Sequence, residues 1–337
     1  MYRESADSRP RVRNRVFLPL SARRVVLLVC FLTVAVGSFN VAAIAAERPS
    51  QGVTLQDVAL SLRPLAAGFS MLQSFHFKAN AIVQIYRDGQ PPLSGGASLE
   101  YWAQGDLFRV SCRTDKELGA TGDIDLSWNG NQSYLFLRAG DSLALGMTRK
   151  VWVPCAIPNP LLLVYHMLEA GSVSRLHRYN LATMDWLTNP SSWQALGAEI
   201  QQQGNLPGAA EWHIVTGMQK DAQAVDFRSD NSVGKVISRI EIQGNLTGEK
   251  STPGDKTLIE VPEYSFFKLQ GTTNIVALPR RVKVTLRHAD GSIRDQLDYT
   301  LGEFNVNQPI PKSVFTLQPG KNTRVWDDDQ KRFLKLP

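Results

Sequence analysis

A period of two in the hydrophobic pattern is the clearest signal along the chain. Between residues 75 and 85 every odd position is apolar, and most even positions are polar. This alternation is typical of a β-strand with one buried face. The same alternation returns at residues 97–101 after Asp88-Gly89, so the two stretches predict a hairpin with a longish loop.

Two further turn signals predict two more hairpins. Asn129-Gly130 lies between the strand-like residues 124–128 and 134–137, and Asp290-Gly291 lies between 282–286 and 297–301. Asn-Gly and Asp-Gly between alternating apolar runs are strong short-range hairpin signals. The chain is therefore expected to form a mostly antiparallel sheet.

Helical spacing precedes and interrupts the strands. Residues 55–69 place apolar side chains at three-and-four spacing, with Thr54 and Asp57 as an N-cap pair and Pro64 positioned to split the helix. A second helix is expected after Asn159-Pro160, because the run 161–168 is apolar nearly all round. A third should begin after Asn189-Pro190, where three apolar residues would share a face: Trp193, Leu196 and Ile200.

The order of helix, strands, helices and strands predicts an α+β fold. Helices of such a fold pack together on one face of the sheet. We therefore expect a strongly curved antiparallel sheet, an incomplete barrel, with the helices covering its concave face.

The first 45 residues have the layout of a secretory signal peptide. Arg23 and Arg24 end a basic stretch, an apolar run follows from residue 25, and Ala43-Ile44-Ala45 provides a cleavage site. The mature chain would then be residues 46–337, in the periplasm. Because the apolar run is about 20 residues long, an uncleaved inner-membrane anchor is the alternative.

The leader also changes the meaning of the net charge. Residues 1–45 carry seven arginines and two acidic residues, which accounts for five of the six net positive charges of the chain. The remainder is close to neutral and has no arginine-rich face, so nucleic acid is not expected as a partner.

Cysteines and histidines provide no catalytic pattern. Cys112 and Cys155 remain after cleavage, and the sequence leaves open whether they form a disulfide or stay as two buried thiols. The histidines are scattered, and no G-x-S-x-G, H-E-x-x-H or phosphate-binding loop occurs. Asp327, Asp328 and Asp329 fit a charged tail end better than a calcium loop. The chain is predicted to be no enzyme and to use no cofactor or metal.

Four stretches resemble, in order, the bacterial outer-membrane lipoprotein carrier family (the LolA type). They are GGASLEYWAQGDLFRV, WNGNQSYLFL, IPNPLLLVYHML and FTLQPGKNTRVWDDDQKR. The resemblance implies one half-barrel domain over residues 46–337, with an enlarged middle region at about 175–271. In that family, helices cover an apolar cavity that holds the acyl chains of a lipoprotein.

The chain departs from the family at the second strand. Trp102-Ala103-Gln104 stands where the family has Lys-Arg-Pro, whose arginine latches the lid helices. The latch is therefore missing, or it has moved to Arg109. This departure puts dedicated lipoprotein shuttling in question more than the shared fold.

The resulting hypothesis is an exported, non-enzymatic binding protein for a lipid acyl chain or a lipoprotein-like ligand, with transient membrane contact. The alternative is an envelope interaction or sensor module with a filled core and a protein partner. The apolar helix at 161–168 would be a lid in the first case and an ordinary core helix in the second. The predicted lining residues are Phe75, Phe77, Val83, Ile85, Leu99, Tyr101, Leu161, Leu163 and Met167.

Overall fold

The computed structural model describes residues 53–87, 89–115, 118, 122–139, 142–149, 185–195, 197–203, 212–216, 223–243, 254–320 and 323–334. The predicted signal peptide, its cleavage site and the helix at 161–168 lie outside these residues and stay predictions. Within the described part of the chain, no helix is long and apolar enough to cross a membrane.

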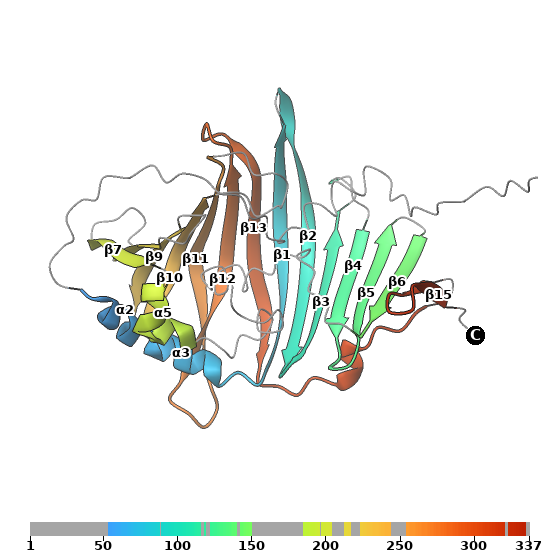
Figure 1. The fold of residues 1–337 in the computed structure, drawn as a ribbon, viewed down its shortest axis with the longest axis horizontal. Helices are drawn as coiled ribbons and strands as arrows, with labels where there is room; N and C mark the ends of the chain where they lie inside the picture. Colours follow the sequence, from blue (N-terminus) through green and yellow to red (C-terminus); the bar gives the residue numbers. More distant parts are fainter. Residues whose placement is uncertain are drawn as a thin grey trace, which may run out of the picture.

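One open sheet of fifteen strands dominates the described fold (Figure 1). Its order is β15-β14-β6-β5-β4-β3-β2-β1-β13-β12-β11-β10-β9-β8-β7, and each neighbouring pair is antiparallel except β14 with β6. The strands are β1 (Ser74–Arg87), β2 (Gln90–Gln104), β3 (Leu107–Thr114), β4 (Gly122–Trp128), β5 (Ser133–Ala139), β6 (Ser142–Thr148), β7 (Ala198–Gln203), β8 (Trp212–Thr216), β9 (Gln223–Asp230), β10 (Gly234–Gln243), β11 (Lys256–Lys268), β12 (Ile275–Arg287), β13 (Ile293–Val306), β14 (Arg324–Asp327) and β15 (Arg332–Leu334).

The predicted antiparallel sheet is confirmed, but the predicted strong curvature is wrong. The sheet is neither closed nor strongly curled, and its end strands β7 and β15 do not pair with each other. Alternation shows which side chains share a face, whereas curvature depends on the twist between many neighbouring strands. The middle region predicted at about 175–271 contains five strands of this sheet, β7 to β11.

The described helices are short and lie over one half of the sheet. They are α2 (Leu55–Ser61), α3 (Arg63–Ser70) and α5 (Pro190–Ala195), and they pack against β7, β10 and β12 (Figure 1). The described fold is therefore mainly β, with a few short helices. The prediction of an α+β fold is confirmed only in part.

The first helix begins and splits as the sequence predicts. Thr54 and Asp57 form a capping box, in which Asp57 N–H donates to Thr54 Oγ1 at 3.2 Å and Thr54 N–H donates to Asp57 Oδ2 at 2.8 Å. α2 ends at Ser61, and α3 carries Pro64 in its first turn, where a missing N–H costs no helical hydrogen bond.

α3 approaches β12 so closely that only glycine fits at the contact. A Cβ placed on Gly68 would lie 2.1 Å from the backbone oxygen of Ile275. This contact fixes the depth at which the helix packs on the sheet.

All three predicted hairpins form, although the first loop is shorter than predicted. Arg87 pairs with Gln90, so the first loop has two residues instead of a long stretch, and Gly89 has φ +67°.

The third predicted helix is shorter than the sequence suggests. α5 ends at Ala195, and Ile200 lies in β7 instead of on the helix. Trp193 remains fully buried, and its Nε1 donates to Leu187 O at 2.9 Å.

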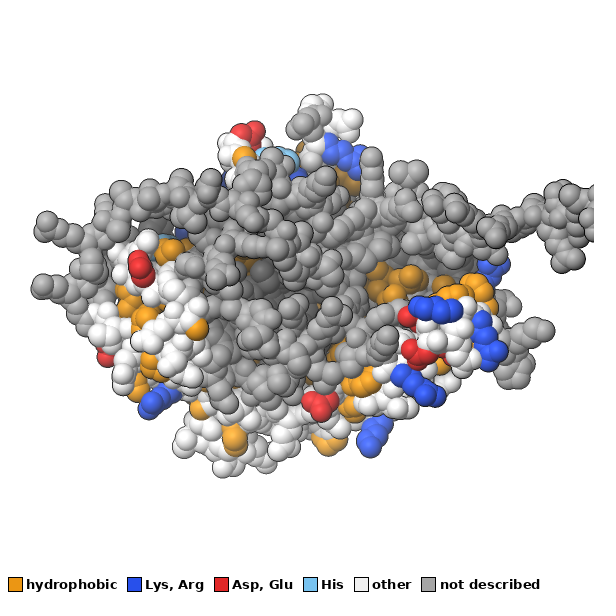
Figure 2. Space-filling model, viewed as in Figure 1, with side chains coloured by type: hydrophobic (Ala, Val, Ile, Leu, Met, Phe, Trp, Pro, Cys, Tyr) orange, Lys and Arg blue, Asp and Glu red, His pale blue; other side chains and the backbone are white. Residues whose placement is uncertain are grey.

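The C-terminal segment crosses to the opposite face of the sheet from the helices. A 3-10 turn forms at Lys312–Phe315, and β14 then adds parallel to β6. A small second cluster holds it there, made of Tyr134, Leu145, Leu317 and Val325. At this end of the molecule, Figure 2 shows basic and hydrophobic side chains side by side.

Two of the three aspartates of this segment hold it in place. Asp329 accepts hydrogen bonds from Arg149 N–H at 2.7 Å and from Thr148 Oγ1 at 2.8 Å, which hold the pKa of its carboxyl below the usual value. Asp327 accepts two backbone N–H groups of the turn that follows. The prediction of a charged tail end is therefore incomplete, because Asp327 and Asp329 also hold the C-terminal segment in place.

Candidate ligand-binding face

The alternating residues of the first hairpin meet on one face of the sheet. β1 and β2 pair so that Phe77 lies opposite Tyr101, and Ala79 lies opposite Leu99. Directly opposed residues of antiparallel strands share a face. The six predicted lining residues of the strands are thus brought together: Phe75, Phe77, Val83, Leu99 and Tyr101 are buried, and Ile85 is half-buried.

Aromatic rings close one end of this face. The rings of Phe75 and Phe77 lie 5.2 Å and 5.6 Å from that of Tyr101, and Phe304 lies 6.0 Å from Phe77. Phe267 extends the group, at 5.2 Å from Phe304. These distances are typical of favourable ring pairs.

Small side chains occupy the middle of the same face. Ala81 lies opposite Ala97, and Val83 lies opposite Gly95. We call Ala79, Ala81, Ala97 and Gly95 the small-residue strip. It runs along the hairpin from the aromatic rings toward Val83, while the described helices pack on β7, β10 and β12.

The three predicted lid residues do not enter this description. Leu161, Leu163 and Met167 lie outside the described residues, so their place over the face stays a prediction. Sequence reasoning also missed two residues next to the strip. Tyr299 pairs with Ala81 from β13, and Leu118 joins the same core cluster. A glycine pair inside a strand pattern, Gly95-Gly96, was the available signal for a close approach.

Two titratable groups on this face are held neutral by burial. Cys112 lies opposite Leu99 and is a free thiol, and burial raises its pKa to about 12. Burial likewise raises the pKa of the Tyr299 phenol well above its ordinary value. A neutral, apolar face suits an apolar ligand better than a charged one.

Cys112 should be inert in the folded protein. Because burial raises its pKa to about 12, the thiol stays protonated at pH 8, and only a thiolate is a good nucleophile. We expect a thiol reagent to label it at pH 8 only after guanidinium unfolds the chain. The measurement is the difference in labelled thiols between the wild type and Cys112→Ser. Fast labelling of Cys112 in the native protein would contradict this prediction.

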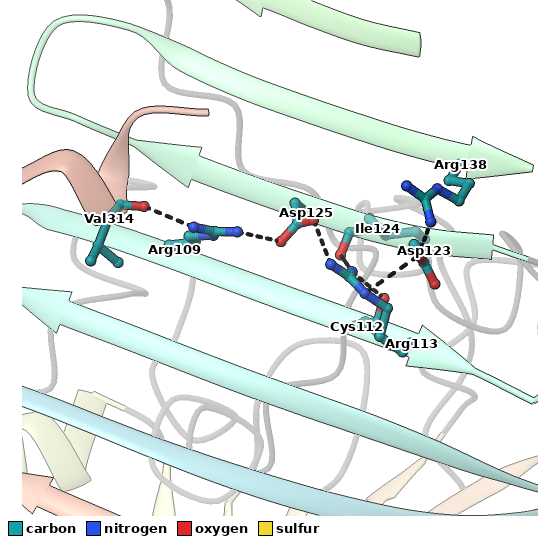
Figure 3. Close-up of polar contacts among 8 residues, drawn as sticks. All are labelled: Arg109, Cys112, Arg113, Asp123, Ile124, Asp125, Arg138 and Val314. Atoms are coloured by element: carbon teal, nitrogen blue, oxygen red, sulfur yellow. Dashed lines mark hydrogen bonds and ion pairs between the residues drawn. The ribbon is translucent and has the colours of Figure 1, made fainter. Parts of the chain in front are cut away.

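The opposite face of the sheet carries a network of charges on β3, β4 and β5 (Figure 3). Asp125, which is 6% exposed, bonds to Arg109 at 3.1 Å and to Arg113 at 2.8 Å. Arg113 and Arg138 also approach Asp123, at 3.5 Å and 3.6 Å. The network ties β3, β4 and β5 together from the side away from the small-residue strip.

Arg109 belongs to this network, through its ion pair with Asp125. Its second guanidinium nitrogen donates to Val314 O at 3.2 Å, and the group lies 5.1 Å from the Trp102 ring. Among the described contacts, Arg109 therefore anchors the C-terminal segment. The lid helix at 161–168 lies outside the described residues, so the hypothesis that the family's latch has moved to Arg109 stays a prediction.

Histidines on this opposite face belong to ion-pair ladders. His76 Nε2 lies 2.8 Å from Glu100, and His213 Nδ1 lies 2.5 Å from Asp226, which also approaches Arg239. In the described part of the chain, no three potential metal ligands come together. These ladders join neighbouring strands, which is their evident role.

Comparison with known proteins returns structural likeness and no sequence match. No family model matches the chain, and no curated protein matches it. A domain from Vibrio parahaemolyticus named for outer membrane lipoprotein sorting is 7% identical, covers 78% of this chain and 97% of its own, and has a TM-score of 0.41. A LolA superfamily protein from Nitrosomonas europaea is 10% identical, covers 77% and 97%, and has a TM-score of 0.31.

A third structure, a DUF1329 family protein from Desulfovibrio piger, is 10% identical, covers 78% of this chain and 95% of its own, and has a TM-score of 0.36. At these identities and TM-scores the likeness says nothing about function, which has to be inferred from the residues of this chain. The chain is structurally similar to LolA superfamily and lipoprotein-sorting proteins, at low identity and over nearly the whole of their length.

Proposed function

We propose that this chain is an exported, non-enzymatic binding protein that holds the acyl chain of a lipid or a lipoprotein against the small-residue strip. The observation that carries the proposal is the gradation of side-chain size on one apolar face. Rings stand at one end, alanines and a glycine lie in the middle beside Leu99, and Val83 and Ile85 lie beyond them. In this proposal the thin apolar chain lies along the strip of small residues, between the larger ones.

Apolar burial would drive such binding. Each methylene group removed from water contributes about 0.8 kcal/mol. From Phe77 to Val83 the strip runs about 20 Å, at roughly 3.3 Å per strand residue. Several methylene groups of an acyl chain would therefore be buried along it.

The second candidate is an interaction or sensor module with a filled core and a protein partner. The observation in its favour is the ring packing itself, because Phe77 and Tyr101 are fully buried. In that case the alanines would be ordinary core residues, and no ligand would co-purify.

Native mass spectrometry followed by denaturing lipid extraction tests the proposal. The protein is purified from the periplasm of its producing cell without detergent. We expect an adduct with the mass of a lipid. Ala97→Leu, which adds bulk to the strip, should reduce the adduct, whereas Ser98→Leu, the neighbouring exposed residue on the other face, should not.

Two outcomes would overturn the proposal. One is a clean apo mass from protein that also fails to bind a fluorescent fatty acid. The other is an adduct that Ala97→Leu and Ser98→Leu reduce equally. The filled-core module would then be the better account.

A further inference from the structure

β2 extends beyond the end of its neighbour β3, and the unpaired stretch includes Gly95 and Gly96. The last pair of the β2–β3 ladder joins Ala97 to Thr114, while β2 continues back to Gln90. The edge of β2 beyond Ala97 is therefore free of β3. Asp115, which follows β3, contacts this edge.

Asp115 holds the turn to β2 through both backbone groups of Gly96. Its N–H donates to Gly96 O at 2.9 Å, and its carboxylate accepts the N–H of Gly96 at 2.7 Å. A side chain on Gly96 would block this contact, because its Cβ would lie 2.6 Å from Asp115 Oδ2.

The same turn places Leu118 over Gly95 on the ligand face. Leu118 N–H donates to Asp115 O at 3.3 Å, and its side chain is 4% exposed. A Cβ on Gly95 would lie 2.6 Å from Leu118 Cγ, so Leu118 occupies the space that a residue at 95 would fill. Gly95 lies opposite Val83, at the far end of the small-residue strip from the rings.

We infer that Leu118 is the size-limiting residue of the ligand face. It ends the strip on one side, as the rings end it on the other, and so sets the length of the apolar chain that the face accepts. The inference rests on the proposed function, because it assigns a specificity-determining residue to the same face.

A double-mutant cycle first tests the contact without any ligand. Gly95→Ala should destabilise the protein, because the new Cβ has to displace Leu118. In a Leu118→Ala background the same change should cost little, so the two effects should not add. If the two effects add, the contact does not exist, and the inference is wrong.

Binding of saturated fatty acids then tests the role. A series that grows by two carbons, from decanoate to stearate, competes with a fluorescent fatty acid. Leu118→Ala should move the preferred length to longer chains, with affinity rising about fourfold for each further methylene buried. Gly95→Ala in the wild-type background should change the preferred length as well, because it moves Leu118.

Leu65→Ala is the matched control. Leu65 is fully buried in α3, over the other half of the sheet, so its loss should lower stability without changing the length preference. If the wild type binds the series and Leu118→Ala behaves like Leu65→Ala, the inference is wrong and the proposed function stands. If the wild type binds none of the series, both are wrong.

Discussion

Replacing Phe77 by alanine is expected to lower the free energy of unfolding by about 3–5 kcal/mol. The ring is fully buried, and it contacts the rings of Phe75, Tyr101 and Phe304 at centroid distances of 6.3, 5.6 and 6.0 Å. Truncation removes apolar burial and leaves a cavity bounded by rigid rings that cannot collapse into it. Urea unfolding, with an unchanged dependence on urea concentration, measures the loss.

Phe266→Ala is the control for this change. Phe266 is 37% exposed and lies on β11, so the same truncation there should cost clearly less. An equal loss at both positions would mean that Phe77 is not held in a packed core. The Phe77 cluster would then be loose enough to open, which would change the description of the aromatic end.

Gly68→Ala should destabilise the protein by about 1–3 kcal/mol, although alanine is the better helix former by roughly 1 kcal/mol. The sign is reversed because the new Cβ would meet the backbone oxygen of Ile275 at 2.1 Å. Because the backbone of β12 cannot rotate away as a side chain can, α3 would have to move away from β12. Thermal or urea unfolding of the variant measures this effect.

Gly302→Ala provides the comparison. Gly302 lies in β13, and nothing stands within 4 Å of the position its Cβ would take. This change should be neutral or slightly stabilising, since it restricts the unfolded chain. Stabilisation by Gly68→Ala would show that the helix does not pack on β12 at this depth.

Local features of the fold could be predicted because their causes are local. The capping box of Thr54 and Asp57, the helix break before Pro64 and the Asn129-Gly130 turn depend on residues within a few positions of one another. Alternation also predicted correctly that Phe77 and Tyr101 share a buried face. These predictions need no information about distant parts of the chain.

Other features depend on contacts between residues far apart in the chain. Thr148 and Asp329 meet although 181 positions separate them, so the aspartates could not be predicted to bind β6. Arg109 donates a hydrogen bond to Val314 O, 205 positions away, and no local pattern pointed to this partner. Ile200 fits a helical stripe, but pairing with Ile214 places it in a strand. In each case a long-range partner overrides the local pattern.

The sequence by itself determined the antiparallel hairpins, the split first helix and the apolar face of β1 and β2, because period, turn residues and caps act over short distances. The tertiary structure alone decided three other matters. These are the open form of the sheet, the identity of the residues that lie next to the small-residue strip, and the contact of Leu118 with Gly95. The physical reason is that register, twist and packing are set by pairs of strands and side chains that the order of residues does not place side by side.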